Sequence, residues 1–122
     1  MKEGKTLKII KQNENIQEIK QIIKPRSYEL MFIINFNTTE KERNELIETY
    51  KNFITENKGE IIKVENIGEK DFAYPINKMK KGYYVLIDFK AYPDDVVKLQ
   101  NLLKNNEKVL RFILIRKDPK ED

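Results

Sequence analysis

The sequence predicts an α+β domain of the ferredoxin-like, split βαβ class, with the order β-α-β-β-α-β and two helices on one face of a four-stranded antiparallel sheet. Two observations predict it. Four segments rich in apolar, β-branched or aromatic residues have the pattern of strands, and two segments between them repeat apolar residues at helical spacing. Because crossover connections are right-handed, we expect the first and third strands in the centre of the sheet and the second and fourth at its edges.

The first predicted strand leads directly into the first predicted helix. Residues 28–36 are apolar at nearly every position, as in a strand buried in mid-sheet. Thr39 and Glu42 fit a capping box that begins the helix. Lys58 and Gly59 predict a cationic last turn and a glycine stop. The buried face of this helix is predicted to carry Leu46, Ile47, Tyr50, Phe53 and Ile54.

A long second strand with an internal bend comes next. Residues 61–67 and 72–76 are expected to form it, with a bulge or bend at Gly68. Pro75 has no amide proton to donate to a neighbouring strand, so this strand belongs at the edge of the sheet. After a lysine-rich turn, residues 83–89 are predicted to form the third strand. The core face of that strand is expected to consist of Tyr83, Val85, Ile87 and Phe89.

A second helix and a last strand complete the order. Pro93 fits the first turn of a helix, and Asp94 and Asp95 favour the positive end of its dipole. Residues 109–115 are the last apolar strand, which contains Arg111. The buried stripe of the second helix is predicted to consist of Val96, Leu99, Leu102 and Leu103.

Apolar side chains on the two central strands also point to the sheet face that no helix covers. These side chains are Met31, Ile33, Tyr84 and Leu86. A cluster of exposed apolar side chains is typical of a surface that binds a partner. Isolated apolar residues are also ordinary on monomer surfaces, which is the alternative interpretation. We predict a partner-binding surface at these four residues.

The residues that carry most enzyme chemistry are missing. The chain contains no Cys and no His, which removes the usual nucleophiles, bases and zinc ligands. Its four glycines are isolated, so none belongs to a phosphate-binding loop. We therefore expect no enzyme activity, no catalytic residue, no cofactor, no metal site and no small-molecule substrate. No stretch approaches the roughly 20 apolar residues of a membrane span, so no membrane partner is expected either.

Positive charge is concentrated near the N-terminus. The chain has 24 basic and 20 acidic residues, a net charge of +4. Its first 27 residues hold seven Lys or Arg and three Glu, so the rest carries 17 charges of each sign and is neutral. We expect residues 1–25 to form a basic extension, disordered or weakly helical in preference to a docking helix. Residues 26–117 would then form the domain, and residues 118–122 a charged tail.

A motif in the second and third strands carries a family resemblance. It reads GEKDFAYPINK at residues 68–78 and GYY at residues 82–84, and Tyr28-Glu29 opens the first strand. Together with the element order, this motif resembles the bacterial small-subunit ribosomal protein S6 family over about residues 26–117. The resemblance implies a structural component of the small ribosomal subunit that binds small-subunit ribosomal RNA together with ribosomal protein S18. A cytoplasmic, ribosome-bound location is expected, and an organellar ribosome stays open.

The same resemblance implies which residues contact RNA. They are Arg26, Lys70, Tyr74, Lys78 and Arg111, joined by Lys80 and Lys81 of the turn. Two residues depart from the family pattern, because Asp71 and Leu110 stand where basic residues are usual.

The same residues have alternative interpretations. The lysines of the turn are also typical of a solvated strand edge, and Arg111 is also placed to pair with a neighbouring acid. A protein-only adaptor that uses the open sheet face, and less favourably a small enzyme on the same fold, are the alternative functions.

Overall fold

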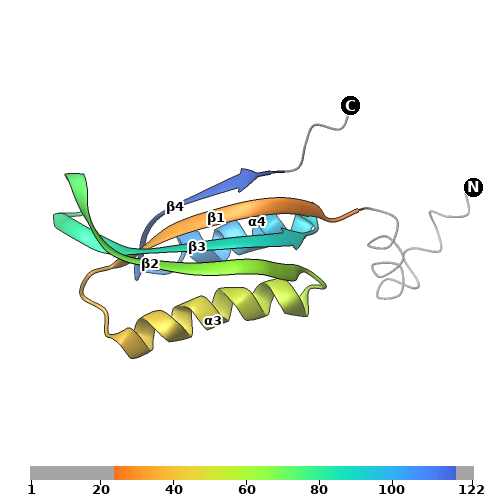
Figure 1. The fold of residues 1–122 in the computed structure, drawn as a ribbon, viewed down its shortest axis with the longest axis horizontal. Coiled ribbons are helices and arrows are strands. Elements are labelled where there is room, and N and C mark those ends of the chain that lie inside the picture. The colour runs from red at the N-terminus through yellow and green to blue at the C-terminus, as the bar shows by residue number, and fades with distance from the viewer. Residues whose placement is uncertain (1–23, 118–122) are drawn as a thin grey trace, which may run out of the picture.

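The computed structural model describes residues 24–117, and the expectations for the basic extension before Lys24 and for the charged tail lie outside them. The chain forms six elements in the expected order (Figure 1). They are β1 (Arg26–Asn35), α3 (Glu40–Glu56), β2 (Glu60–Ile76), β3 (Met79–Ala91), α4 (Pro93–Lys104) and β4 (Val109–Arg116). None of the helices in this part of the chain is long and apolar enough to span a membrane.

The four strands form one antiparallel sheet in the order β2-β3-β1-β4. This order confirms that the first and third strands are central and that the second and fourth are edges. Both helices lie on the same side of the sheet, so one sheet face is covered and the other is open (Figure 1). The ferredoxin-like, split βαβ prediction is therefore confirmed.

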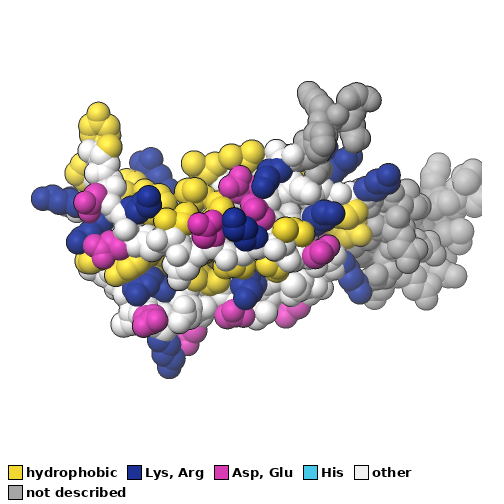
Figure 2. Space-filling view, viewed as in Figure 1, with side chains coloured by type: hydrophobic (Ala, Val, Ile, Leu, Met, Phe, Trp, Pro, Cys, Tyr) yellow, Lys and Arg dark blue, Asp and Glu magenta, His cyan; other side chains and the backbone are white. Residues whose placement is uncertain are grey.

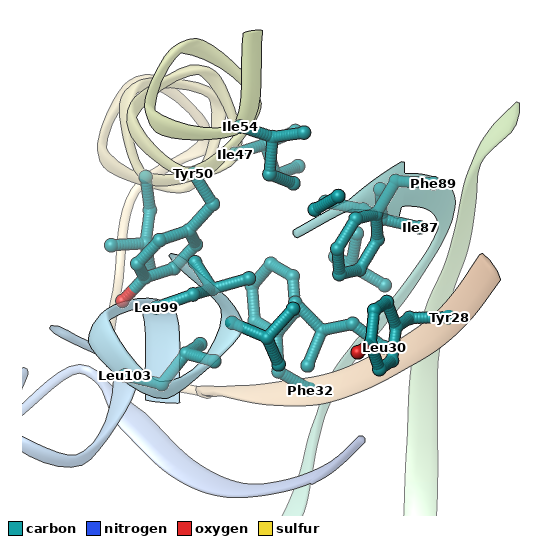
Figure 3. Close-up of a cluster of buried hydrophobic side chains, with 14 of the residues drawn as sticks. Tyr28, Leu30, Phe32, Ile47, Tyr50, Ile54, Ile87, Phe89, Leu99 and Leu103 are labelled. Atoms are coloured by element: carbon teal, nitrogen blue, oxygen red, sulfur yellow. The ribbon is translucent and has the colours of Figure 1, made fainter. Parts of the chain in front are cut away.

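The core lies between the covered sheet face and the two helices (Figure 3). Leu30 and Phe32 of β1 and Ile87 of β3 have no measurable exposure. The Phe32 ring meets the Tyr50 ring of α3 edge to face, with centroids 5.3 Å apart, and burial raises the pKa of Tyr50 to about 12. Every second residue of the central strands and one stripe of residues on each helix point into this core, as the sequence pattern predicts.

The capping box at the start of α3 is confirmed. The Glu42 amide donates to the Thr39 hydroxyl over 3.1 Å, and the Thr39 amide donates to the Glu42 carboxylate over 2.9 Å. The hydrogen bond from the Thr39 amide lowers the pKa of Glu42. These two bonds satisfy amides that the first turn of a helix leaves without partners.

The predicted end of α3 and one predicted core residue of α4 are wrong. The helix ends at Glu56, before Lys58, so its last turn carries no basic residue. Lys58 adopts the left-handed conformation at φ 71°. Gly59 is needed for space instead, because a Cβ there would lie 2.7 Å from Ile54 Cγ2. On α4, Leu102 is 42% exposed, because helix rotation of about 100° per residue carries it to the border of the buried stripe.

The second strand is long, bent and at the edge, as predicted. Gly68 has a φ of +100° and lies at a shift in the register between β2 and β3. Pro75 lies near the end of this edge strand, where its missing amide costs no bond in the interior of the sheet. Asn77 and Lys78 form the turn into β3 with φ values of 50° and 68°. Two consecutive positive φ values are those of a type I′ hairpin turn.

Candidate nucleic-acid and protein interface

The open sheet face carries a continuous apolar surface. Met31 pairs with Leu86 across the two central strands, and Ile33 pairs with Tyr84. All four side chains are partly buried by one another and by their strands, and no helix lies over them. The structure therefore brings the four predicted partner-binding residues together in two adjacent cross-strand rows.

Two residues that were not among the four predicted extend this surface onto the edge strand β4. Ile113, which pairs with Met31, is 60% exposed, and Ile115, which pairs with Glu29, is 51% exposed. Figure 2 shows hydrophobic side chains gathered between the projecting hairpin and β4. We call the six residues Met31, Ile33, Tyr84, Leu86, Ile113 and Ile115 the open-face patch. The strand parity of Ile113 and Ile115 is that of the charged Arg111, which is a sequence signal that they face outward.

The hairpin of β2 and β3 projects beyond the rest of the sheet (Figure 1). The pairing of β1 with β3 ends at Asn35 and Gly82, whereas β2 and β3 continue to the turn. Tyr74 on this arm is 82% exposed. An arm with no sheet neighbour on either side can reach a second molecule without moving the domain.

The predicted RNA-binding residues fall in three places. Lys70, Tyr74, Lys78, Lys80 and Lys81 lie on the projecting hairpin. Arg111 of β4 lies opposite Ile33 and so borders the open-face patch on its far side. Arg26 lies opposite Ala91 at the other end of the sheet, away from the hairpin. Within the described residues, the side chains of Lys70, Lys78, Lys80 and Arg111 take part in no ion pair or hydrogen bond, so the salt-bridge alternative for Arg111 is not realised there.

Lys81 differs from the other hairpin lysines because the protein itself engages it. Its Nζ lies 2.9 Å from a Glu69 carboxylate oxygen, and that hydrogen bond raises the pKa of Lys81. The same ammonium lies 4.7 Å from the centroid of the Phe36 ring. Lys81 is therefore the one predicted RNA-binding lysine of the hairpin that a carboxylate and a ring of the described residues engage.

The Phe36 ring belongs to a stack that supports the base of the hairpin. It lies against the Tyr83 ring with centroids 5.4 Å apart, and Cζ of the Arg43 guanidinium lies over the Tyr83 ring, 3.7 Å from its centroid. Arg43 also donates to the Thr38 carbonyl over 2.6 Å. Local patterns in the sequence do not predict this stack, because its members come from the loop after β1, from α3 and from β3.

The chemistry of the described residues is that of a binding surface. Within residues 24–117, no group of three or more Asp or Glu side chains is arranged to hold a metal ion. The surface offers ammonium groups, aromatic rings and aliphatic side chains, which bind phosphates, bases and other apolar surfaces.

Comparison with known proteins decides the family. The sequence model of the family described as ribosomal protein S6 matches residues 27–116. This chain belongs to the ribosomal protein S6 family. The family resemblance carried by the motif at residues 68–78 is thereby confirmed, and so is the expectation of a non-enzymatic protein, because the family consists of structural proteins of the ribosome.

Individual members of the S6 family agree with this assignment. The small ribosomal subunit protein bS6 of Caldanaerobacter subterraneus subsp. tengcongensis is 42% identical over 93 residues, which is 76% of this chain and 98% of that protein. The bS6 protein of Helicobacter pylori is 42% identical over 97 residues, or 80% of this chain and 68% of that protein. The crystal structure of 30S ribosomal protein S6 from Thermotoga maritima superposes with a TM-score of 0.73 at 39% identity, over 77% of this chain and 89% of that one.

Proposed function

We propose that this S6-family chain is a structural component of the small ribosomal subunit that binds small-subunit ribosomal RNA together with ribosomal protein S18. One observation carries the proposal. The open-face patch is continuous with the basic hairpin at one end and with Arg111 at the β4 edge, so one surface offers protein-binding and phosphate-binding chemistry side by side.

The RNA part of the proposal rests on cations that no side chain of the described residues pairs with. Lys78 lies in the turn and Lys80 is exposed beside it, and no acid of the described residues neutralises either side chain. Such ammonium groups displace counterions from phosphates without reading sequence. Tyr74, with most of its surface in solvent, offers a ring on which an unpaired base stacks.

Three of the proposed RNA-binding residues have narrower roles. Lys81 is held by Glu69, so we assign it to positioning of the hairpin. Lys70 pairs with Gly82 at the base of the hairpin and offers a phosphate contact there. Arg26 is at the opposite end of the sheet, so it serves only an RNA segment that spans the domain.

The protein part of the proposal rests on the open-face patch. Ile113 and Ile115 are more than half exposed, and burying such aliphatic side chains against another protein removes apolar area from water. A ribose-phosphate backbone is charged and hydrated and offers little apolar surface for such side chains to contact. The patch therefore favours a protein as its occupant. A protein-only adaptor, the alternative function, would use the same patch to bind a protein but would bind no RNA.

The test is the salt dependence of RNA binding by the full chain with ribosomal protein S18 present, on an RNA that contains the central-domain junction of small-subunit ribosomal RNA. The logarithm of the binding constant should fall linearly with the logarithm of salt concentration. Lys78→Ala and Arg111→Ala should each reduce the slope by about one. Lys104→Ala, at the end of α4 on the covered side, is the matched control that should leave the slope unchanged. Salt-independent binding, or equal slopes for all variants, would contradict RNA binding and favour the adaptor.

A further inference from the structure

The projecting hairpin contains a hollow that its strand pairing creates. β2 and β3 are in register at Asp71 and Lys81 and again at Ile76 and Met79. Between these pairs, the four residues 72–75 of β2 stand opposite the single residue Lys80 of β3. An excess of residues on one strand forces that strand to bulge away from its partner. The bulge leaves a hollow of about 480 Å³.

The lining of the hollow combines an apolar wall, two ammonium groups and one carboxylate. Phe72, Ala73 and Pro75 supply the apolar wall, Lys80 and Lys81 the ammonium groups, and Asp71 the carboxylate. No hydrogen bond from the described residues occupies the Asp71 carboxylate, which acts on Lys81 only through its charge. The hollow therefore keeps an acceptor and a free cation available for a ligand.

The hollow is held in shape from two sides. On the open face, the Phe72 ring lies against the Tyr84 ring with centroids 6.2 Å apart. On the other side, Glu69 and Phe36 hold Lys81, and Phe36 in turn stacks on Tyr83. A site whose walls are fixed before binding loses less conformational freedom when the ligand enters.

We propose that this hollow binds one unpaired nucleotide of RNA, with its base against Phe72 and Pro75, a flanking phosphate at Lys80, and the Watson–Crick edge of the base at Asp71. This inference rests on the proposed function, because it names a subsite of the same RNA surface. Unstacked bases pack on aromatic side chains and present their Watson–Crick edges for hydrogen bonding.

The Asp71 carboxylate selects among the bases. A carboxylate only accepts hydrogen bonds, and its two oxygens can accept from two adjacent donors. Guanine offers such a pair, its ring N1–H and its exocyclic amino group, whereas uracil offers a single N–H between two carbonyl oxygens. Guanine is therefore the base that the hollow favours. In this subsite Asp71 contacts the base and Lys80 contacts the phosphate.

The experiment measures fluorescence anisotropy of the full chain with short single-stranded oligouridines that carry one central G, A, C or U, at constant salt. Lysines elsewhere bind every oligonucleotide, so the ratio of affinities is the readout. We expect the G oligonucleotide to bind about five-fold or more tightly than the all-U one. Asp71→Asn should abolish this ratio. Glu65→Gln removes the same charge from β2 outside the hollow and should preserve the ratio.

Two further variants separate the subsite from general RNA binding. Ala73→Ile places aliphatic bulk in the hollow and should reduce the preference for G, whereas Lys80→Ala should weaken all four oligonucleotides and keep their ratio. Ala73 and Lys80 are both exposed, and circular dichroism confirms that the variants fold. Equal affinities for the four oligonucleotides, or a preference that survives Asp71→Asn or Ala73→Ile, would overturn this inference. The salt slope measured with the junction RNA decides the proposed function independently, so the two can fail separately.

Discussion

The two faces of the sheet use the same strands for different purposes. On the covered face, Leu30 and Phe32 of β1 and Val85 of β3 are at most 1% exposed. On the open face, the intervening residues Met31 and Tyr84 are apolar too, yet no helix covers them. A shift of one residue along a strand therefore separates the side chains that form the core from those that lie on the open face.

This difference shows how a small domain can keep its stability independent of its partner. The covered face closes a complete core with two helices, and its aromatic pair Phe32 and Tyr50 lies at the centre of that core. Side chains on the open face can then change with the partner while the fold stays the same. Substitutions on the two faces should consequently have separable effects on unfolding and on association.

The largest expected effect is on the covered face. Phe32→Ala removes a fully buried ring and its edge-to-face contact with Tyr50, so the free energy of unfolding should fall by about 3–5 kcal/mol. Ile33→Ala, one residue along the strand, is the matched substitution on the open face and should cost much less. Urea denaturation of both variants, followed by circular dichroism, measures the difference. Equal losses of unfolding free energy in the two variants would show that both faces contribute equally to the stability of the fold.

The next effect is on association. Ile33→Asp places a carboxylate in the middle of the open-face patch, beside Tyr84, where a docked protein would desolvate it. Binding to the proposed partner, ribosomal protein S18, should weaken by about a hundred-fold or more, because a buried unpaired charge costs several kcal/mol. Isothermal titration calorimetry measures the affinity, and the urea midpoint reports on the fold. If association is unchanged in a folded variant, the patch does not bind the partner.

A third substitution tests Gly82, a buried position where the open face is closely packed. A Cβ at Gly82 would lie 2.7 Å from Ile33 Cγ2 and 3.0 Å from Phe72 Cζ. Gly82→Ala should lower the free energy of unfolding by about 1–3 kcal/mol, because those side chains must move. Since Phe72 also lines the hairpin hollow, the proposed preference of the hollow for G should weaken as well. A variant as stable as the parent would show that the open face adjusts freely there.

The smallest effect is at the cap of α3, the helix that covers the sheet beside β2. Thr39→Ala removes the hydroxyl that accepts from the Glu42 amide and should cost about 1 kcal/mol of unfolding free energy. The pKa of Glu42 is lowered in the folded chain. The ionised carboxylate therefore stabilises the fold above the ordinary Glu pKa of 4.5, and this stabilisation is lost as the pH falls through the lowered pKa. Urea unfolding at neutral and acidic pH should therefore differ less for Glu42→Gln than for the parent chain. An equally large change in stability between the two pH values in both chains would show that the Glu42 carboxylate does not stabilise the cap.

Local patterns in the sequence predicted most of the fold. The capping box at Thr39 and Glu42, the bend at Gly68 and the edge position of Pro75 each follow from the conformational limits of one or two residues. Strand parity on β1 and β3 correctly separated the core from the open face. Ile113 and Ile115 have the strand parity of the charged Arg111, which is a sequence signal that they face outward, and their exposure in the structure agrees with it. These features succeed because their causes lie within a few residues of one another.

The parts that failed depend on contacts between distant segments. Leu102 sits at the border of its helix stripe, where small differences in packing decide burial. The hairpin hollow arises from a mismatch in pairing between β2 and β3, and neither strand contains that information alone.

The central claim is that the open-face patch and the basic hairpin together attach this chain to the small ribosomal subunit. Its most direct test is co-sedimentation of the full chain with small subunits that lack their S6 protein, in high salt. We predict that the parent chain and the Lys104→Ala control remain bound, whereas Ile33→Asp combined with Lys78→Ala is released although it folds. A parent chain that does not co-sediment, or a double variant that stays bound as well as the parent, would contradict the account.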